Sequence, residues 1–149
     1  MEPVLYASCR VGDLLIGIDV TAVQEVTAGA ALTPVPLASP LVSGLLNLRG
    51  QIVTAIDLRR CLQMHDRPAG VRPQHVILQA AGGVSLLVDD VGDVIALDPE
   101  SIEAAPRTLP AHLRGLIAGA CDVDGVQLLT LDVDRVLNLA AGEQVSIGG

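Results

Sequence analysis

The histidines and aspartates are the side chains best suited to catalytic or metal-binding chemistry. His65, His75 and His112 each stand alone, without the close spacing of zinc ligands, and are interpreted as surface or loop residues. Asp89 or Asp93 could serve a small hydrolase together with a histidine, but a turn in which they bond nearby amides is the simpler interpretation. The chain has no lysine and no G-x-S-x-G serine, which excludes Schiff-base, Walker-type and nucleophile-elbow chemistry. This inventory predicts a binding protein without metal or cofactor, rather than an enzyme.

Two charged residues, Glu25 and Arg49, interrupt apolar segments. Glu25 lies within 23–26 (VQEV), and Arg49 lies within 48–51 (LRGQ). Side chains alternate between the faces of a strand, so Val23 and Glu25 are expected to share a face. From the pattern alone, the favoured interpretations are a solvent-facing strand residue and a residue at a hairpin tip. Together, the two could form an ion pair beside exposed aliphatic side chains, as in a protein-binding groove.

Turn residues divide the chain into short apolar segments that predict antiparallel hairpins. The expected hairpins pair 4–11 with 14–18, 41–48 with 51–56, 75–80 with 84–88, and 113–121 with 126–131. Asp57 and Asp132 are predicted to cap short helices over 58–62 and 133–139. Segments 29–40 and 98–110 contain prolines and predict loops, while 63–73 is the one plausible linker.

The pattern restarts after this linker, which indicates an internal repeat. Gly50 precedes Asp57 by seven residues, and Gly125 precedes Asp132 by the same seven. Further matches align Gly12 and 18–19 with Gly82 and 88–89, and 44–46 with 115–117. The repeat predicts two units of about five strands, over approximate halves 1–66 and 67–149 of a single domain 1–149. We expect two small β-barrels that share a core, because closure removes exposed sheet edges.

The composition indicates a soluble acidic domain with an aliphatic core. The 149 residues carry a formal net charge of −8, and 1% of them are aromatic. Phosphate contacts need clustered cations and bases stack on aromatic rings, so a single-strand nucleic-acid barrel is disfavoured. Cys9, Cys61 and Cys121 are odd in number and widely spaced, which predicts free, buried thiols in a reducing cytoplasm. The longest segment without a charge, 26–48, contains three prolines, so no membrane insertion is expected.

Five segments, taken in order along the chain, carry a family resemblance. They are 23–26 (VQEV), 33–36 (TPVP), 44–53 (GLLNLRGQIV), 56–59 (IDLR) and, in the second half, 88–94 (VDDVGDV). These segments resemble the CheW family, the coupling proteins of bacterial chemotaxis. The resemblance implies an all-β fold of two intertwined five-stranded, SH3/OB-like β-barrels with short helices. The longer terminal helix of some relatives is not expected, because the chain stops soon after the predicted helix 133–139.

The same resemblance implies a non-enzymatic, cytoplasmic adaptor without a cofactor. Such a protein couples the cytoplasmic tip of a chemoreceptor, a methyl-accepting chemotaxis protein, to the regulatory domain of a CheA-type histidine kinase. The alternative is the same role in a pathway that controls type IV pili or another surface response. Receptor- or kinase-binding roles are implied for Val23, Glu25, Gly44, Arg49, Gly50 and Val94. Glu25 and Arg49 rank above the two glycines, which can act through turn dihedrals alone.

Overall fold

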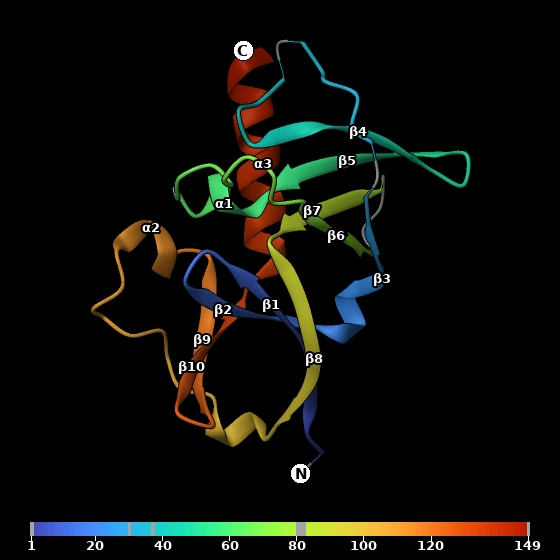
Figure 1. Ribbon diagram of the computed structural model, residues 1–149. Coiled ribbons are helices and arrows are strands. Elements are labelled where there is room, and N and C mark those ends of the chain that lie inside the picture. Colours follow the sequence, from blue (N-terminus) through green and yellow to red (C-terminus); the bar gives the residue numbers. More distant parts are fainter. Residues whose placement is uncertain (1, 30, 37, 80–82, 149) are drawn as a thin grey trace.

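The strands form two five-stranded sheets, and the computed structural model describes residues 2–29, 31–36, 38–79 and 83–148 (Figure 1). Sheet A consists of β1 (Val4–Val11), β2 (Leu14–Asp19), β8 (Asp90–Leu97), β9 (Ile117–Val123) and β10 (Val126–Leu131), in the order β8-β1-β2-β10-β9. Sheet B consists of β3 (Val23–Ala28), β4 (Val42–Leu48), β5 (Gln51–Asp57), β6 (Gln74–Leu78) and β7 (Val84–Val88), in the order β3-β6-β7-β5-β4. The predicted all-β fold class and the five strands in each unit are confirmed.

The predicted hairpins form because short turns join their strands. β1–β2, β4–β5, β6–β7 and β9–β10 are antiparallel pairs. Gly12, Gly50 and Gly125 have positive φ angles in three of the turns, which glycine adopts without steric cost. The turn of the β6–β7 hairpin includes residues 80–82, so the match of Gly82 to Gly12 lies outside the described residues.

The chain passes between the sheets at two places. It leaves sheet A after β2 through the short 3₁₀ helix η1 (Val20–Ala22), and it returns at Asp89, between β7 and β8. Sheet B is therefore one continuous stretch, 23–88, whereas sheet A combines strands from near both ends of the chain. Two pairs, β2–β10 in sheet A and β5–β7 in sheet B, are parallel.

The internal repeat appears as a repeated topology. In each half, the first hairpin joins one sheet and the next three strands join the other, so β1, β2, β3, β4 and β5 correspond to β6, β7, β8, β9 and β10. The predicted match of Gly44 to Gly115 is wrong, since Gly44 corresponds to Gly119. A Cβ atom at Gly44 would lie 2.7 Å from the Thr33 carbonyl oxygen, and one at Gly119 would lie 2.7 Å from that of Glu103. The two hairpins keep the 75-residue offset that relates Gly50 to Gly125 and Asp57 to Asp132, and this offset places Gly44 opposite Gly119, four residues after Gly115.

Helices cover parts of the two sheets. Asp57 caps α1 (Leu58–Cys61) by accepting a hydrogen bond from the Arg59 amide at 3.0 Å, as predicted. Two further short helices, η2 (Pro99–Ser101) and α2 (Ala111–Arg114), lie between β8 and β9. The last helix, α3 (Val133–Gly148), has 16 residues, so the prediction of a short helix ending at Leu139 is wrong.

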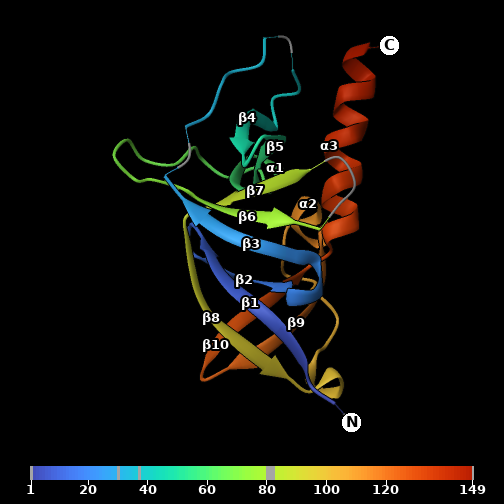
Figure 2. The same cartoon turned by 90° about the vertical axis from the view of Figure 1, so that its right-hand side faces the viewer.

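α3 continues because it packs beyond the predicted end. Val136 and Ala140 are both buried in the core, one helical turn apart. Figures 1 and 2 show α3 starting beside sheet A and running along sheet B. No helix among the described residues is long and apolar enough to cross a membrane.

Three clusters of buried side chains make up the core. The largest cluster lies between the sheets and joins Ile16 and Ile18 of β2 to Val76 of β6 and Leu86 of β7. Each sheet also encloses a small cluster of its own, around Leu128 in sheet A and around residues such as Val53 and Leu87 in sheet B. The two sheets therefore share a core, although each sheet takes strands from both of the expected halves, 1–66 and 67–149.

Neither sheet is a closed barrel by its backbone hydrogen bonds among the described residues. β8 and β9 are the edges of sheet A, and β3 and β4 are the edges of sheet B. Residues from the connecting loops cover two of these edges through isolated bridges, Thr33 to Leu45 on β4 and Glu103 to Ala120 on β9. The expectation of closure was wrong because loop residues, rather than the opposite edge strands, provide these partners.

Candidate functional site

Glu25 and Arg49 form a two-pronged ion pair on the surface of sheet B. Arg49 Nη1 donates to Glu25 Oε1 at 2.5 Å, and Arg49 Nη2 donates to Glu25 Oε2 at 2.6 Å. The Arg49 side chain is 69% exposed, whereas that of Glu25 is 24% exposed. The pairing predicted from the sequence is present, with the guanidinium as its outward group.

The β4–β5 turn positions Arg49. Arg49 and Gly50 have φ angles of 51° and 84°, the positive pair that a two-residue type I′ hairpin turn requires. Asn47 Oδ1 closes the turn by accepting a hydrogen bond from the Gly50 amide at 2.9 Å. The turn therefore holds a bulky residue in the left-handed region, where asparagine and glycine are usually found.

The repeat supplies an equivalent turn in sheet A. Asp124 and Gly125 have φ angles of 51° and 82°, and Asp122 accepts from the Gly125 amide at 2.9 Å. The backbone of the two turns is therefore the same, while the charge at the first turn position is opposite. Asp124 provides a matched control for substitutions at Arg49.

The ion pair joins opposite edges of sheet B. Glu25 lies on the edge strand β3, and Arg49 lies at the end of the other edge strand, β4. The hydrogen bonds from Arg49 lower the pKa of the Glu25 carboxyl, and the same contact raises the pKa of Arg49. A guanidinium has five N–H donors and this pair uses two, so Arg49 can still donate to a partner.

The other predicted residues have different surroundings. Val23 is half-buried and packs against the central core, and a β-bulge separates it from Glu25 in the pairing with β6. Gly44 is buried where Thr33 approaches β4, which gives it a structural reason to be glycine. Gly50 completes the turn described above. Val94 is 58% exposed on β8, in sheet A.

The structure thus joins Glu25, Arg49 and Gly50 in one site, but places Val94 on the other sheet. Two exposed aliphatic residues of the same sheet were not singled out from the sequence. Val26 on β3 is 42% exposed and Ile52 on β5 is 58% exposed. Val26 lies on the strand that carries Glu25, and Ile52 lies on the strand that follows the Arg49 turn. The only sequence signal for their exposure was the alternation of side chains between the two faces of a strand.

Two of the residues considered for catalysis, His75 and Asp89, are engaged in structural contacts. His75 is buried on β6, contrary to its interpretation as a surface or loop residue, and its Nδ1 lies 3.1 Å from Ser85 Oγ. Burial lowers the pKa of the His75 imidazole. The cysteines are free and buried, as predicted, and burial raises the pKa of Cys9 and Cys61 to about 12. Within the described ranges, no three His, Cys, Asp or Glu side chains are placed to hold a metal ion.

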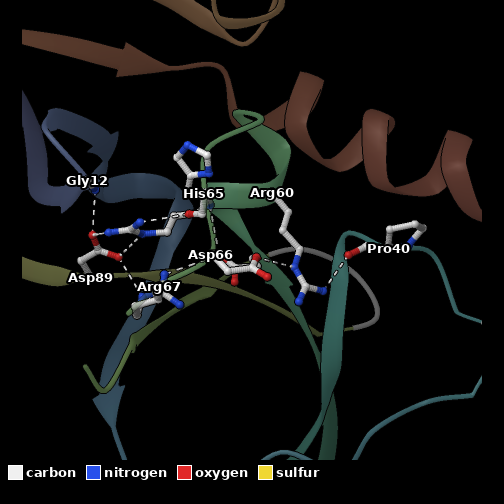
Figure 3. Close-up of polar contacts among 9 residues, drawn as sticks. Gly12, Pro40, Arg60, His65, Asp66, Arg67 and Asp89 are labelled. Carbon is white, nitrogen blue, oxygen red and sulfur yellow. Dashed lines mark hydrogen bonds and ion pairs between the residues drawn. The ribbon is translucent and has the colours of Figure 1, made fainter. Parts of the chain in front are cut away.

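Asp89 belongs to an ion network that sequence analysis missed (Figure 3). Its carboxylate accepts hydrogen bonds from the Gly12 amide at 2.7 Å, from Arg59 Nε at 2.9 Å and from Arg67 Nε at 2.8 Å. Burial by itself raises the pKa of Asp89, but these hydrogen bonds, led by Arg59, hold it well below its usual range. A carboxylate so occupied is unsuited to act as a general base. Its partners lie 22 to 77 positions away, so no local pattern could reveal them.

Comparisons with known proteins show which family the chain resembles over most of its length. The CheW-like domain model matches residues 5–141. The chemotaxis protein CheW of Rhizobium meliloti (strain 1021) is 31% identical over 130 residues, which cover 85% of this chain and 83% of that protein. The chemotaxis protein CheW of Bacillus subtilis (strain 168) is 32% identical over 122 residues, which cover 81% and 78% of the two chains.

A solved structure shows the same fold. The crystal structure of the scaffolding protein TtCheW from Thermoanaerobacter tengcongensis superposes with a TM-score of 0.77 at 26% sequence identity. The superposition covers 87% of this chain and 89% of that one. Two stacked five-stranded sheets are therefore shared with a protein described as a scaffold.

Proposed function

The chain belongs to the family of CheW-like domains, and from that premise we propose that it is a non-enzymatic adaptor of bacterial chemosensory signalling. In this proposal it couples the cytoplasmic tip of a chemoreceptor to the regulatory domain of a CheA-type histidine kinase. The observation that carries the proposal is the ion pair between Glu25 and Arg49. It presents a preorganised, outward-facing guanidinium on a sheet whose strands β3 and β5 also expose the aliphatic side chains of Val26 and Ile52.

This surface has the features of a specific protein contact. Exposed apolar area supplies affinity, whereas an oriented charge supplies register and partner selection. Glu25 holds the guanidinium in one geometry, so less side-chain freedom is lost when a partner binds. We assign Arg49 as the contacting residue and Glu25 as the residue that orients it. Val94, exposed on sheet A, belongs to a second contact surface in this proposal.

The test is calorimetric titration of the folded protein with the kinase regulatory domain and, separately, with a receptor tip peptide hairpin. Arg49→Glu and Glu25→Arg should each weaken binding to at least one partner by about tenfold or more. The matched control, Asp124→Asn, changes the equivalent turn of the repeat and should bind like the wild type.

The charge-swapped double variant Glu25→Arg/Arg49→Glu separates two roles of the pair. Our assignment expects binding to stay weak, because the partner meets a carboxylate where it needs a guanidinium. Restored binding would mean that the pair acts only within this chain. A wild-type protein that binds neither partner would contradict the adaptor role itself.

The alternative output, a pathway that controls type IV pili or another surface response, uses the same coupling chemistry. One relative, protein FrzA of Myxococcus xanthus, is 27% identical over 129 residues. The two outputs differ in which kinase domain binds, so a titration against both kinase domains decides between them.

A further inference from the structure

The point where the chain returns from sheet B to sheet A is a single residue, Asp89. β7 of sheet B ends at Val88, and β8 of sheet A begins at Asp90. The position of β8, and of Val94 on it, therefore depends on how this residue is held. The other passage, η1, is a longer segment of three residues.

Asp89 is held from sheet A and from the helix and segment that follow β5 of sheet B. From sheet A, the Gly12 amide in the β1–β2 turn donates to Asp89 Oδ2 at 2.7 Å, and the Asp89 amide donates to the Arg10 carbonyl at 2.9 Å. From the other side, Arg59 of α1 donates to both carboxylate oxygens, and Arg67 donates to Oδ1. The side chains of Arg59, Arg67 and Asp89 are 12%, 8% and 15% exposed, so solvent screens these charges weakly.

Arg67 connects this point to the end of β5. Its Nη2 lies 3.4 Å from Asp57 Oδ1, while its Nε donates to Asp89, so one guanidinium joins two buried carboxylates. Arg67 belongs to segment 63–73, which the sequence suggested as a linker. Met64 of the same segment packs against the β1–β2 turn, where a side chain at Gly12 would overlap its methyl group. The segment therefore fastens the two sheets together.

The repeat shows that this arrangement is not required by the fold. The residues equivalent to Asp89, Asp57 and Arg59 are Asp19, Asp132 and Asp134, and they line an open cleft of about 440 Å³ beside η1. None of the described residues that line this cleft is basic. Asp19 makes only local contacts there, with the amide and hydroxyl of Thr21. Among the described residues, ion pairs therefore hold the β7–β8 passage in place, whereas none does so at the η1 passage.

We propose that Arg67 and Asp89 are positioning residues that fix the orientation of sheet A relative to sheet B. Together with Arg59 they form a clamp across the β7–β8 passage. The clamp sets Val94 on sheet A at a constant geometry relative to the Glu25–Arg49 pair on sheet B. The role of the clamp in coupling receptor to kinase rests on the proposed adaptor function, whereas its effect on the orientation of the sheets does not.

The test is an NMR measurement of backbone residual dipolar couplings on the isolated protein. In the wild type, amides of both sheets should fit one alignment tensor, since the sheets move as one body. In Arg67→Met, the tensors of sheet A and sheet B should differ in orientation or magnitude. The Gly12 amide should also exchange with solvent about tenfold faster or more, because its acceptor is no longer held.

Controls separate this role from a general loss of stability. Arg60→Met removes two exposed contacts from the same region, to Asp66 at 3.3 Å and to the Pro40 carbonyl at 2.9 Å, and should leave both readouts unchanged. Arg67→Lys and Asp89→Asn keep a hydrogen-bonding side chain, and they provide folded variants should Arg67→Met unfold. Both should separate the two tensors. A lysine cannot bridge two carboxylates as a planar guanidinium does, and a neutral asparagine gives the two arginines no charged acceptor.

Folded Arg67 and Asp89 variants whose two sheets share one tensor of wild-type orientation would overturn the clamp. The measurement needs no partner, so it stands even if the wild type binds no kinase domain. Conversely, an Arg49 variant that loses binding but keeps a single tensor would uphold the adaptor role independently of the clamp.

Discussion

At Arg49, backbone conformation and side-chain pairing oppose each other. A φ angle of 51° is unfavourable for arginine but is tolerated by asparagine. Arg49→Asn should therefore leave the urea midpoint of unfolding unchanged or slightly raised, while partner binding is lost. The pKa of Glu25 should rise toward its ordinary value, because its lowering comes from Arg49.

The Glu25 pKa is measured from its carboxyl carbon shift as a function of pH. Asp124→Asn, at the equivalent turn, should show the same backbone benefit with no change at Glu25. A marked loss of stability in Arg49→Asn would mean that the ion pair outweighs the turn strain.

His75 makes the stability depend on pH near neutrality. Its pKa in the folded protein is lowered by burial, so below about pH 6.5 the unfolded chain binds a proton that the folded protein does not. Stability should therefore fall as pH decreases from about 6.5, by at most about 1.4 kcal/mol per pH unit for this one group.

Urea midpoints at pH 7.5 and pH 5 test this expectation. The decrease should be smaller in His75→Gln, which cannot take up the proton but can still reach Ser85. Equal decreases in both proteins would assign the pH dependence to other groups, and the buried imidazole would then titrate normally.

Sequence reasoning found the Glu25–Arg49 pair but missed the Asp89 network. Glu25 and Arg49 interrupt apolar segments, so each was visible as an exception to a local pattern. Asp89 follows an apolar strand in the manner of an ordinary turn residue, and Arg67 lies in a segment without any apolar period. Their contact depends on the meeting of two sheets, which no local pattern encodes.

At the scale of the elements, two glycines allow loops to cover edge strands. A Cβ atom at Gly44 or at Gly119 would lie 2.7 Å from a loop carbonyl oxygen, closer than real contacts permit. Gly44→Ala and Gly119→Ala should each destabilise the protein by about 1–3 kcal/mol, as overpacked sites do. Urea unfolding of both variants measures the loss.

The matched control is Gly142→Ala in α3. A Cβ atom there has nothing within 4 Å, and alanine favours a helix interior over glycine by up to about 1 kcal/mol. This substitution should therefore stabilise the protein. Gly44 and Gly119 variants of unchanged stability would show that the loops shift to accommodate the Cβ atom. The two isolated bridges would then contribute little to stability.

The hairpins were predictable because their signals are local, whereas the length of α3 was not. A turn dipeptide such as Asp124-Gly125 fixes both strands beside it. The predicted end of α3 at Leu139 followed from a short apolar pattern. The burial of Ala140 against the core, a tertiary contact, carries the helix further.

At the scale of the whole molecule, the repeat predicted two units but not how the chain is shared between them. The unit visible in the sequence is a half of the chain, whereas each sheet contains strands from both halves. Parallel pairing of β2 with β10 brings together residues more than a hundred positions apart, as for Leu15 and Leu128. Local turn signals carry no information about such pairs.

This sharing makes the chain a single cooperative unit, in our proposal. Sheet B is continuous over 23–88, so a fragment of residues 20–90 contains all of its strands. It lacks the partner surface of the central core. Seven of its aliphatic residues buried there to 3% exposure or less would face water: Ile56, Leu58, Leu62, Val76, Leu78, Leu86 and Val88. Each contributes about 1.5–3 kcal/mol when buried, a sum comparable to the whole stability of a small domain, about 5–15 kcal/mol.

The fragment should therefore lack dispersed amide resonances and a cooperative urea transition, although it retains the small cluster around Val53 and Leu87. In the full chain, Tyr6 fluorescence from sheet A and the amide resonances of sheet B should report one coincident unfolding transition. A folded fragment, or two separate transitions in the full chain, would show that sheet B is independently stable. In that case the clamp at Asp89 would join two separate domains. Loss of the clamp would then allow more motion between the sheets than a shared core permits.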